Sequence, residues 1–187
     1  MSAPSQSLVC SLRHGGVSAG SPVASTAFAT TAAERLEILS RYSNIAVVGL
    51  STNPNRPSYF AALYMLRRGY KIVPVNPRAE EILGQRCYPS LRDIPEAVEI
   101  VDIFRPSAAV PPIVEDAITI GAKVVWMQFG VVNEDAAQRA REAGLEVVMD
   151  QCVKVEHARF FGGLNTLGLN TGVISSRRWS PQGGRKS

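Results

Sequence analysis

Ile45-Ala-Val-Val-Gly49-Leu-Ser51-Thr-Asn-Pro-Asn-Arg56-Pro57 is the stretch that decides the fold. Its first four residues show no polar alternation, which predicts a buried parallel strand. The run ends at Gly49, a polar loop with two prolines follows, and Ser58 is a candidate N-cap for a helix that starts with Tyr59. A strand, a loop of small residues and a helix N-terminus present backbone N–H groups and a positive dipole end to a phosphate. The stretch therefore predicts a loop that holds a phosphate-bearing cofactor.

Length and composition predict one soluble globular domain. The chain has 187 residues, of which 45% are hydrophobic and 19% are charged. No stretch approaches the ~18 apolar residues of a membrane-spanning helix, so we expect no integral membrane protein. The three cysteines, Cys10, Cys87 and Cys152, have no Cys-x-x-Cys spacing. They argue against a disulfide framework and a zinc site and favour a reducing, cytoplasmic location.

The net charge of +4 belongs to the two ends of the chain. Of the 20 basic and 16 acidic residues, residues 1–33 hold one base and no acid, and residues 171–187 hold four bases and no acid. Residues 34–170 therefore carry 15 bases against 16 acids. The predicted body has no excess of positive charge, so we expect neither nucleic acid nor membrane as its partner. A basic tail that touches RNA or a membrane is the weaker alternative to a solvated end.

Three regions are expected along the chain. Residues 1–29 are rich in Ser, Ala and Gly without periodicity, which predicts a disordered extension. This extension vaguely resembles an organellar transit peptide, so an organellar location is the alternative to the cytoplasm. Residues 30–161 hold the predicted fold, and residues 162–187 form a flexible basic tail.

Strands and helices alternate with short connections through the predicted fold. Strands are expected at 45–48, 70–75, 99–104, 123–127 and 145–149. Helices are expected from Thr31 to about 42, at 58–68, briefly at 79–83, from 111 to 120, from Asn133 to about 143, and at 154–160, and a weak helix or a turn is expected at 91–97. This alternation predicts a doubly wound α/β fold with a five-stranded parallel sheet, in the order 3-2-1-4-5.

Ligands of such sheets bind beyond the carboxyl ends of the strands, where the strand order reverses. That rule selects the four strand-end loops 49–56, 76–78, 104–107 and 128–130. Arg56, Arg78 and Arg105 lie in three of these loops. A single arginine is most often a solvated surface charge, but three on one rim can converge on one anion.

The dinucleotide fingerprint is incomplete. The stretch from Gly49 lacks the second and third glycines of Gly-x-Gly-x-x-Gly, and the second strand ends in Asn76-Pro77 where an acid would bind a ribose. No Walker-type loop is present either. A nicotinamide-binding role is weakened and stays as an alternative.

No catalytic or metal site is predicted. Cys152 lies near Asp150 and His157 in the sequence, but proximity along a chain is not catalytic geometry, and a cysteine is commonly a small buried hydrophobe. The two histidines, His14 and His157, are not placed to share a metal ion.

The ordered motifs resemble those of the stand-alone bacterial CoA-binding domain proteins. These proteins are similar to the nucleotide-binding N-terminal domain of the succinyl-CoA synthetase alpha subunit. The resemblance covers residues 34–161. The matching motifs are Ile45-Ala-Val-Val-Gly49-Leu-Ser51, Arg56-Pro57-Ser58, Gly69-Tyr70, Pro74-Val75-Asn76-Pro77-Arg78, Gly84, Asp102-Ile-Phe104-Arg105-Pro106, Gly121-Ala122-Lys123, Trp126-Met127-Gln128 and Val148-Met149-Asp150.

The resemblance implies a Rossmann-like domain that binds coenzyme A at the selected rim. Residues 49–53 and Arg56 would hold the phosphates, residues 75–78 would line the adenosine end, and residues 104–107 would close the other side. Gln128 and Gly130 match the turn after the fourth strand. The implied site residues are Gly49, Ser51, Thr52, Asn53, Arg56, Val75, Asn76, Pro77, Arg78, Phe104, Arg105, Pro106, Ser107, Gln128 and Gly130.

Two departures from the family pattern are the residue at position 151 and the long head and basic tail, to which nothing transfers from the resemblance. Residue 151 is Gln where the family often has Arg. The synthetases phosphorylate a histidine in a separate domain, and we expect no such domain in this chain. The expected function is therefore binding of CoA or an acyl-CoA, without catalysis. A NAD(P)-dependent oxidoreductase and a non-catalytic component of an acyl-CoA ligase are the alternatives, and a second copy or an enzyme is a possible partner.

Overall fold

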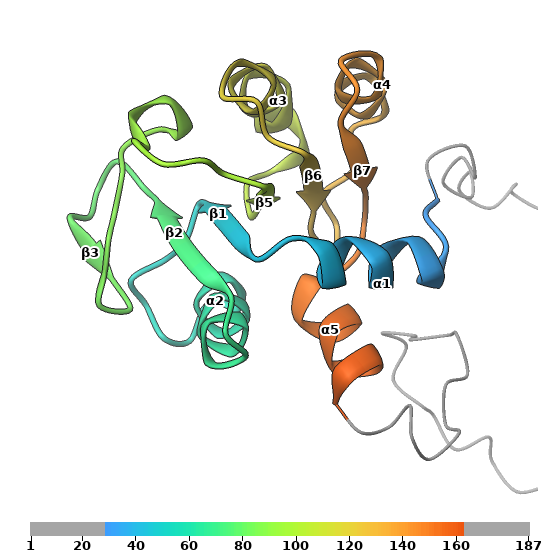
Figure 1. The fold of residues 1–187 in the computed structure, drawn as a ribbon. Helices are drawn as coiled ribbons and strands as arrows, with labels where there is room; N and C mark the ends of the chain where they lie inside the picture. Colours follow the sequence, from blue (N-terminus) through green and yellow to red (C-terminus); the bar gives the residue numbers. More distant parts are fainter. Residues whose placement is uncertain (1–28, 163–187) are drawn as a thin grey trace, which may run out of the picture.

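The computed structural model describes residues 29–162, which form an α/β fold around a parallel sheet (Figure 1). The sheet strands are β1 (Asn44–Val48), β2 (Lys71–Val75), β5 (Ile100–Ile103), β6 (Val124–Met127) and β7 (Glu146–Val148). The helices are α1 (Ala32–Arg41), α2 (Pro57–Arg67), α3 (Val110–Thr119), α4 (Glu134–Glu142) and α5 (Val153–Phe161). The predicted five-stranded, doubly wound α/β fold is confirmed. Within the described residues, no helix is both long and apolar enough to cross a membrane.

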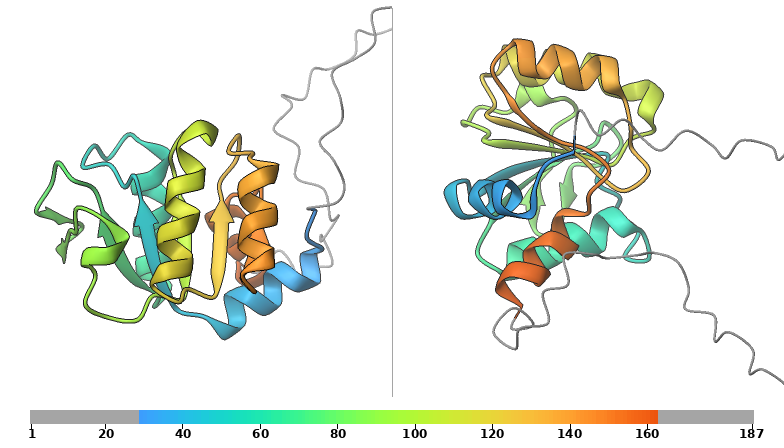
Figure 2. Two further views of the ribbon diagram at one scale, coloured as in Figure 1. Left: turned by 90° about the horizontal axis from the view of Figure 1, so that it is seen from above. Right: turned by 90° about the vertical axis from the view of Figure 1, so that its right-hand side faces the viewer.

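Helices cover both faces of the sheet (Figure 2). On one face, side chains such as Val101 and Val125 pack with Val114 of α3 and Ala137 of α4. On the other face, the helices α1, α2 and α5 supply the cover, with Ile38, Ala61 and Val153 among the core residues. Buried on both faces of the sheet, residues 45–48 of β1 form a continuous apolar run, as the sequence pattern predicted.

The predicted strand order 3-2-1-4-5 is wrong. The order is β2-β1-β5-β6-β7, which in chain order is 2-1-3-4-5. Pro74 supplies the physical reason, because a proline cannot donate a ladder hydrogen bond and belongs in an edge strand. β2 pairs with β1 alone in the five-stranded sheet, and the third predicted strand, β5, lies between β1 and β6 with all four residues buried.

The segment after β2 folds back along that edge. Tyr88 forms a parallel bridge with Val75, and the N–H of Tyr88 donates to the Pro74 carbonyl over 2.9 Å. The helix expected at 79–83 is also wrong, because β3 (Glu81–Ile82) and β4 (Gln85–Arg86) form an antiparallel hairpin. Leu83 and Gly84 form its two-residue turn with φ of 59° and 69°, the backbone that such tight hairpins require. Of the weak helix or turn expected at 91–97, the structure has the turn, a single 3-10 turn, η2 (Leu91–Asp93).

Helix starts follow local capping chemistry. Thr31 and Glu34 form the predicted capping box, and the Asn133 side chain accepts from the Ala136 N–H over 2.9 Å. Ser58 is not an N-cap: α2 starts at Pro57, which suits the first helical position, with Arg56 before it. A second short 3-10 turn, η3 (Ser107–Ala109), leads into α3.

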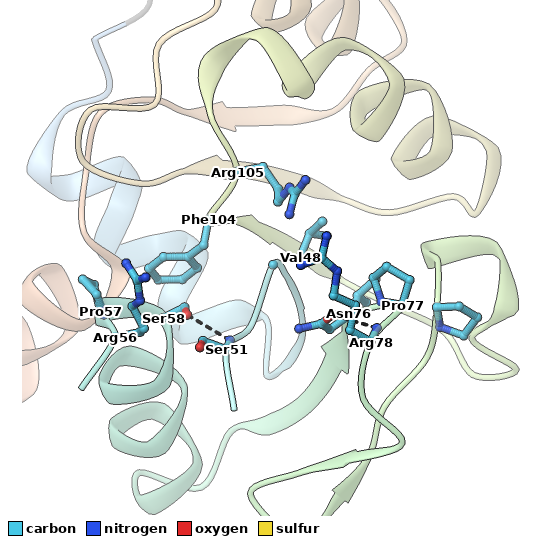
Figure 3. A pocket seen from close by; sticks show the side chains of 13 residues that line it. Val48, Ser51, Arg56, Pro57, Ser58, Asn76, Pro77, Arg78, Phe104 and Arg105 are labelled. Carbon is cyan, nitrogen blue, oxygen red and sulfur yellow. Dashed lines mark hydrogen bonds between the residues drawn. The ribbon is translucent and has the colours of Figure 1, made fainter. Parts of the chain in front are cut away.

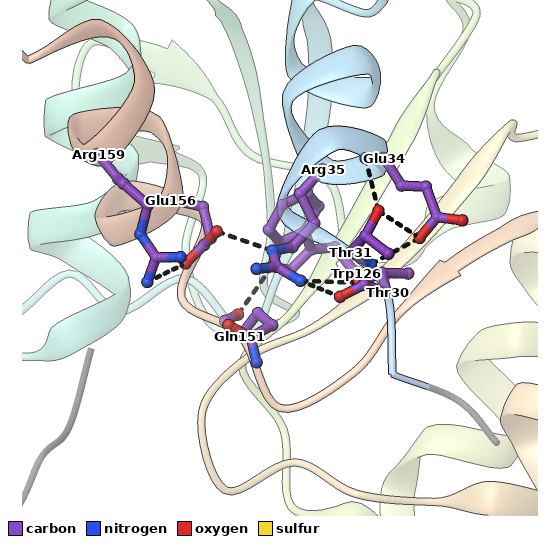
Figure 4. Close-up of polar contacts among 8 residues, drawn as sticks. All are labelled: Thr30, Thr31, Glu34, Arg35, Trp126, Gln151, Glu156 and Arg159. Carbon is purple, nitrogen blue, oxygen red and sulfur yellow. Dashed lines mark hydrogen bonds and ion pairs between the residues drawn. The ribbon is translucent and has the colours of Figure 1, made fainter. Parts of the chain in front are cut away.

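A buried ion network joins α1 to α5 (Figure 4). Arg35 Nε donates to Glu156 Oε2 over 2.7 Å, and Arg159 contacts the other carboxylate oxygen over 3.2 Å. Glu156 is 1% exposed, so these two arginines compensate its buried negative charge. Beside them, Trp126 Nε1 donates to the carbonyl of Gln151, which ties β6 to the start of α5. The network thereby holds α1 against α5 on the face of the sheet that these two helices share with α2.

The predicted extension 1–29 and tail 162–187 lie outside the described residues, apart from residues 29 and 162.

Candidate functional site

A cavity of about 580 Å³ opens at the carboxyl ends of β1, β2 and β5, where the strand order reverses (Figure 3). We call it the arginine pocket. It is lined by Val48, Gly49, Ser51, Arg56, Pro57, Ser58, Val75, Asn76, Pro77, Arg78, Pro89, Phe104 and Arg105. In Figure 3, Arg56 and Phe104 come from one side of this pocket and Asn76, Pro77 and Arg78 from the other.

Gly49 lets the ends of β1 and β5 approach closely. Its φ is +85°, and a Cβ at this position would lie 2.8 Å from Cδ of Arg105 and 3.0 Å from the carbonyl oxygen of Phe104. Its N–H donates to the Val75 carbonyl over 3.0 Å. Any larger residue would be strained and would displace Arg105. Glycine at position 49 therefore fixes one wall of the arginine pocket.

The loop after β1 uses most of its own N–H groups. The N–H groups of Ser51, Asn53, Asn55 and Arg56 all donate within the loop or to Ser58, over 2.9–3.1 Å. Within the described residues, the N–H groups of Thr52 and Ser58 have no protein acceptor. The loop is thus rigid and offers few open backbone donors, so side chains must supply most contacts to an anion. The N-terminus of α2 adds its dipole at the same place.

Asn76 ties the second strand-end loop to the first. Its Nδ2 donates to the Leu50 carbonyl over 2.8 Å, and its Oδ1 accepts from the Arg78 N–H over 2.9 Å. Both ends of this amide are therefore occupied by the backbone. Asn76 sets the direction in which the loop carries Arg78.

The three arginines make the arginine pocket strongly positive. Arg56, Arg78 and Arg105 are exposed, and within residues 29–162 none of them forms an ion pair with a carboxylate. None of the described residues that line the pocket is Asp or Glu. Three unpaired guanidinium groups without a counter-charge form a site for a polyanion, since guanidinium matches phosphate and carboxylate oxygens in pairs.

A second cavity, of about 760 Å³, adjoins the first, and we call it the apolar pocket. Pro57, Phe104 and Arg105 line both cavities. The remaining lining residues are Asn55, Phe60, Ala61, Pro106, Gln128, Phe129, Val131, Cys152 and Lys154. One ligand could therefore run from the arginine pocket past Phe104 into the apolar pocket.

A buried acid lies behind the apolar pocket. Asp102 in β5 is 1% exposed, and burial raises the pKa of its carboxyl group from 3.8 to about 7. The hydrogen bond from Gln128 Nε2 to Asp102 Oδ1, 2.7 Å long, opposes this rise. Gln128 is itself buried, so Asp102 holds the orientation of an amide that lines the pocket.

Cys152, Asp150 and His157 do not form a catalytic array. No hydrogen bond among the described residues joins any two of them. Asp150 Oδ1 accepts from the Gly130 N–H over 2.7 Å, and His157 Nδ1 bonds to the Tyr64 hydroxyl over 3.1 Å. Burial raises the pKa of the Cys152 thiol, which disfavours the reactive thiolate.

Most of the residues predicted for the site line one of the two pockets. The arginine pocket takes Gly49, Ser51, Arg56, Val75, Asn76, Pro77, Arg78, Phe104 and Arg105, and the apolar pocket takes Pro106 and Gln128. Thr52, Asn53, Ser107 and Gly130 line neither. Asn53 Oδ1 accepts from the Asn55 N–H within its own loop. Ser107 Oγ accepts from the N–H of Val132, which links the loop after β5 to the segment that precedes α4.

Several lining residues were not predicted from the sequence. Pro89 lines the arginine pocket because the segment after β2 folds back along the sheet edge. No pattern in the sequence predicts that fold-back. Phe129 lies inside a selected strand-end loop, so its position on the rim could have marked it. Phe60 lies one turn into α2, where an apolar residue is usually taken for core.

Comparisons with known proteins agree with this fold. A family model described as a CoA binding domain matches residues 43–158. The Bacillus subtilis protein YneT, described as uncharacterized, is 45% identical over 126 residues, which are 67% of this chain and 93% of that protein. The ADP-forming acetate–CoA ligase II of Archaeoglobus fulgidus is 31% identical over 138 residues, which are 71% of this chain and only 20% of the ligase. The solved structure of a hypothetical protein from Pyrococcus horikoshii OT3 matches with a TM-score of 0.69 at 42% identity, over 74% of this chain and 98% of that one.

Proposed function

The chain belongs to the CoA-binding domain family, and on that premise we propose that it binds coenzyme A, free or as an acyl-CoA, at the carboxyl ends of its strands. The observation that carries the proposal is the arginine pocket, in which three arginines without ion pairs among the described residues line one cavity. CoA carries a pyrophosphate and a 3′-phosphate, so it gives three guanidinium groups a common ligand.

The proposed roles follow the positions of the lining residues. Arg56, Arg78 and Arg105 bind phosphate oxygens, helped by the Ser51 hydroxyl and the open N–H group of Ser58. Gly49 and Asn53 shape the loop that carries these groups. Val75, Asn76 and Pro77 form the wall for the adenosine. Phe104, Pro106 and Gln128 line the path of the pantetheine arm towards the apolar pocket. Ser107 and Gly130 support the loops from behind.

The proposal assigns no catalytic residue to this chain. The chain matches only 20% of the Archaeoglobus fulgidus acetate–CoA ligase II, so the activity of that whole enzyme is not assigned to it. The same match favours a second role, as a CoA-binding component that works beside a catalytic partner. The chain alone, given CoA, acetate and ATP, should form no acetyl-CoA in a chromatographic assay, and formation of the thioester would contradict this assignment.

Calorimetric titration of the full chain tests the proposal. CoA should give a saturable heat at tens of micromolar protein, and dephospho-CoA, which lacks the 3′-phosphate, should bind more weakly. NADH, titrated in parallel, should bind more weakly than CoA. A protein that binds NADH and gives no heat with CoA would instead support a nicotinamide-dependent enzyme.

A further inference from the structure

Two large hydrophobic side chains stand half-exposed on the border of one cavity. Phe60 is 51% exposed and Phe129 is 50% exposed, and both line the apolar pocket. They come from α2 and from the loop after β6, so the fold brings them together from distant parts of the chain. Phe161, at 47%, is the third exposed large hydrophobic residue in the described part, and it lines neither pocket. Exposed aromatic surface gathered at a concave site indicates a ligand that covers it.

The rest of the wall has the same character. Pro57, Ala61, Pro106 and Val131 add apolar surface, and no described residue that lines this pocket is Asp or Glu. Of the polar lining groups, Gln128 already donates to the buried Asp102, and Arg105 and Lys154 are the two charged ones. Away from these two cations, the wall gives little to a charged group and much to a hydrocarbon.

The apolar pocket, with a volume of about 760 Å³, extends beyond the wall that it shares with the arginine pocket, as far as Phe129 and Lys154. The arm of a CoA in the arginine pocket would enter past Phe104, which borders both cavities. The free thiol of CoA would leave most of the surface of the two phenyl groups in contact with water. A group attached to the sulfur would continue into the apolar pocket and displace this water.

We propose that the ligand is an acyl-CoA thioester whose hydrocarbon acyl group occupies the apolar pocket between Phe60 and Phe129. This inference rests on the proposed function, because the CoA part must lie in the arginine pocket. Lys154 also lines the apolar pocket and forms no ion pair within the described residues. A dicarboxylic acyl group that reaches Lys154 is therefore the competing ligand, and the experiment separates the two.

The experiment is a series of calorimetric titrations of the full chain with CoA, acetyl-CoA, butyryl-CoA and hexanoyl-CoA. Affinity should rise along the series by up to about fourfold for each methylene that becomes buried. Phe129→Ala, and separately Phe60→Ala, should flatten the rise. Phe161→Ala removes an equally exposed phenyl group outside both pockets and should keep the rise unchanged.

Each contrary outcome has its own meaning. Equal affinity for CoA and every acyl-CoA would overturn the acyl site and leave the proposed function standing. Tighter binding of succinyl-CoA than of butyryl-CoA would overturn the hydrocarbon assignment in favour of a contact with Lys154. An absence of binding by the whole series, CoA included, would overturn the proposed function and this inference together.

Discussion

At the scale of single residues, the arginine pocket depends on guanidinium groups that have no partner of their own among the described residues. Arg56 follows β1, Arg78 follows β2 and Arg105 follows β5, so each comes from a different loop. A bound phosphate would supply the missing counter-charge. In the free protein, the positive charges of these three arginines therefore have no counter-charge among the described residues.

Replacing one of these arginines should weaken CoA binding by a measurable amount. Arg56→Ala and Arg78→Ala should each cost about 1.5–3 kcal/mol of binding free energy, the range for a hydrogen bond to a charged group. Titration calorimetry measures the change. Arg67→Ala is the matched control, because Arg67 is exposed at the opposite end of α2 from the pocket and lines neither cavity. An unchanged affinity in an arginine variant would remove that residue from the site.

Asp102 should make the stability of the fold depend on pH. Burial raises the pKa of its carboxyl group to about 7, so between pH 4 and 7 the folded protein keeps a proton that the unfolded chain has lost. Stability should therefore fall as pH rises through this window, by at most about 1.4 kcal/mol per pH unit, and should level off above pH 7.

Asp102→Asn removes the titrating group and tests this account. The variant should be more stable than the parent at pH 8, by up to about 4 kcal/mol, and should match it near pH 4. Denaturant unfolding at several pH values gives the comparison. Asp135→Asn, at an exposed position on α4, is the control and should keep the parent's slope. A slope that survives in Asp102→Asn would assign the pH dependence to another group.

At the scale of elements, the strands and most helix boundaries could be predicted, because burial and capping are local in sequence. Apolar runs marked all five sheet strands, and Thr31 and Asn133 marked two helix starts. The strand order could not be predicted from alternation alone. Pro74 indicates part of the strand order, because a proline within a strand restricts β2 to an edge of the sheet. The hairpin at 81–86 depends on a left-handed turn at Leu83, a residue type that gives no such signal.

The same difference between local and tertiary information explains which of the site residues could be predicted from the sequence. The site residues on strand-end loops, the three arginines among them, follow from the general rule that ligands bind beyond the carboxyl ends of parallel strands. Pro89 and Phe60 depend on how a later segment or a helix face packs, which is a tertiary property. Sequence reasoning therefore found the charged half of the site better than the apolar half.

The attachment of α1 to α5 gives an element-scale prediction. Glu156→Gln leaves two arginines without their shared carboxylate and should cost about 3–5 kcal/mol of stability, as for other broken buried pairs. Arg35→Met should cost less, because Arg159 still pairs with Glu156. Denaturant unfolding of both variants measures the difference. Equal losses would mean that Arg159 contributes nothing to the network.

At the scale of the whole molecule, the fold brings the arginine pocket and the apolar pocket together at the point where the strand order reverses. β1 and β5 are neighbours there, and Gly49 lets the loop after β5 come close enough to share a wall. The corrected strand order matters for this reason. In the order 3-2-1-4-5, the loop with Phe104 and Arg105 would have been separated from the β1 loop by the whole width of β2.

A crystal structure of the full chain with CoA tests the central claim most directly. The account predicts electron density for the phosphates beside Arg56, Arg78 and Arg105, with the pantetheine arm passing Phe104 towards the apolar pocket. Clear density for CoA at another surface, with the arginine pocket free of ligand, would contradict it.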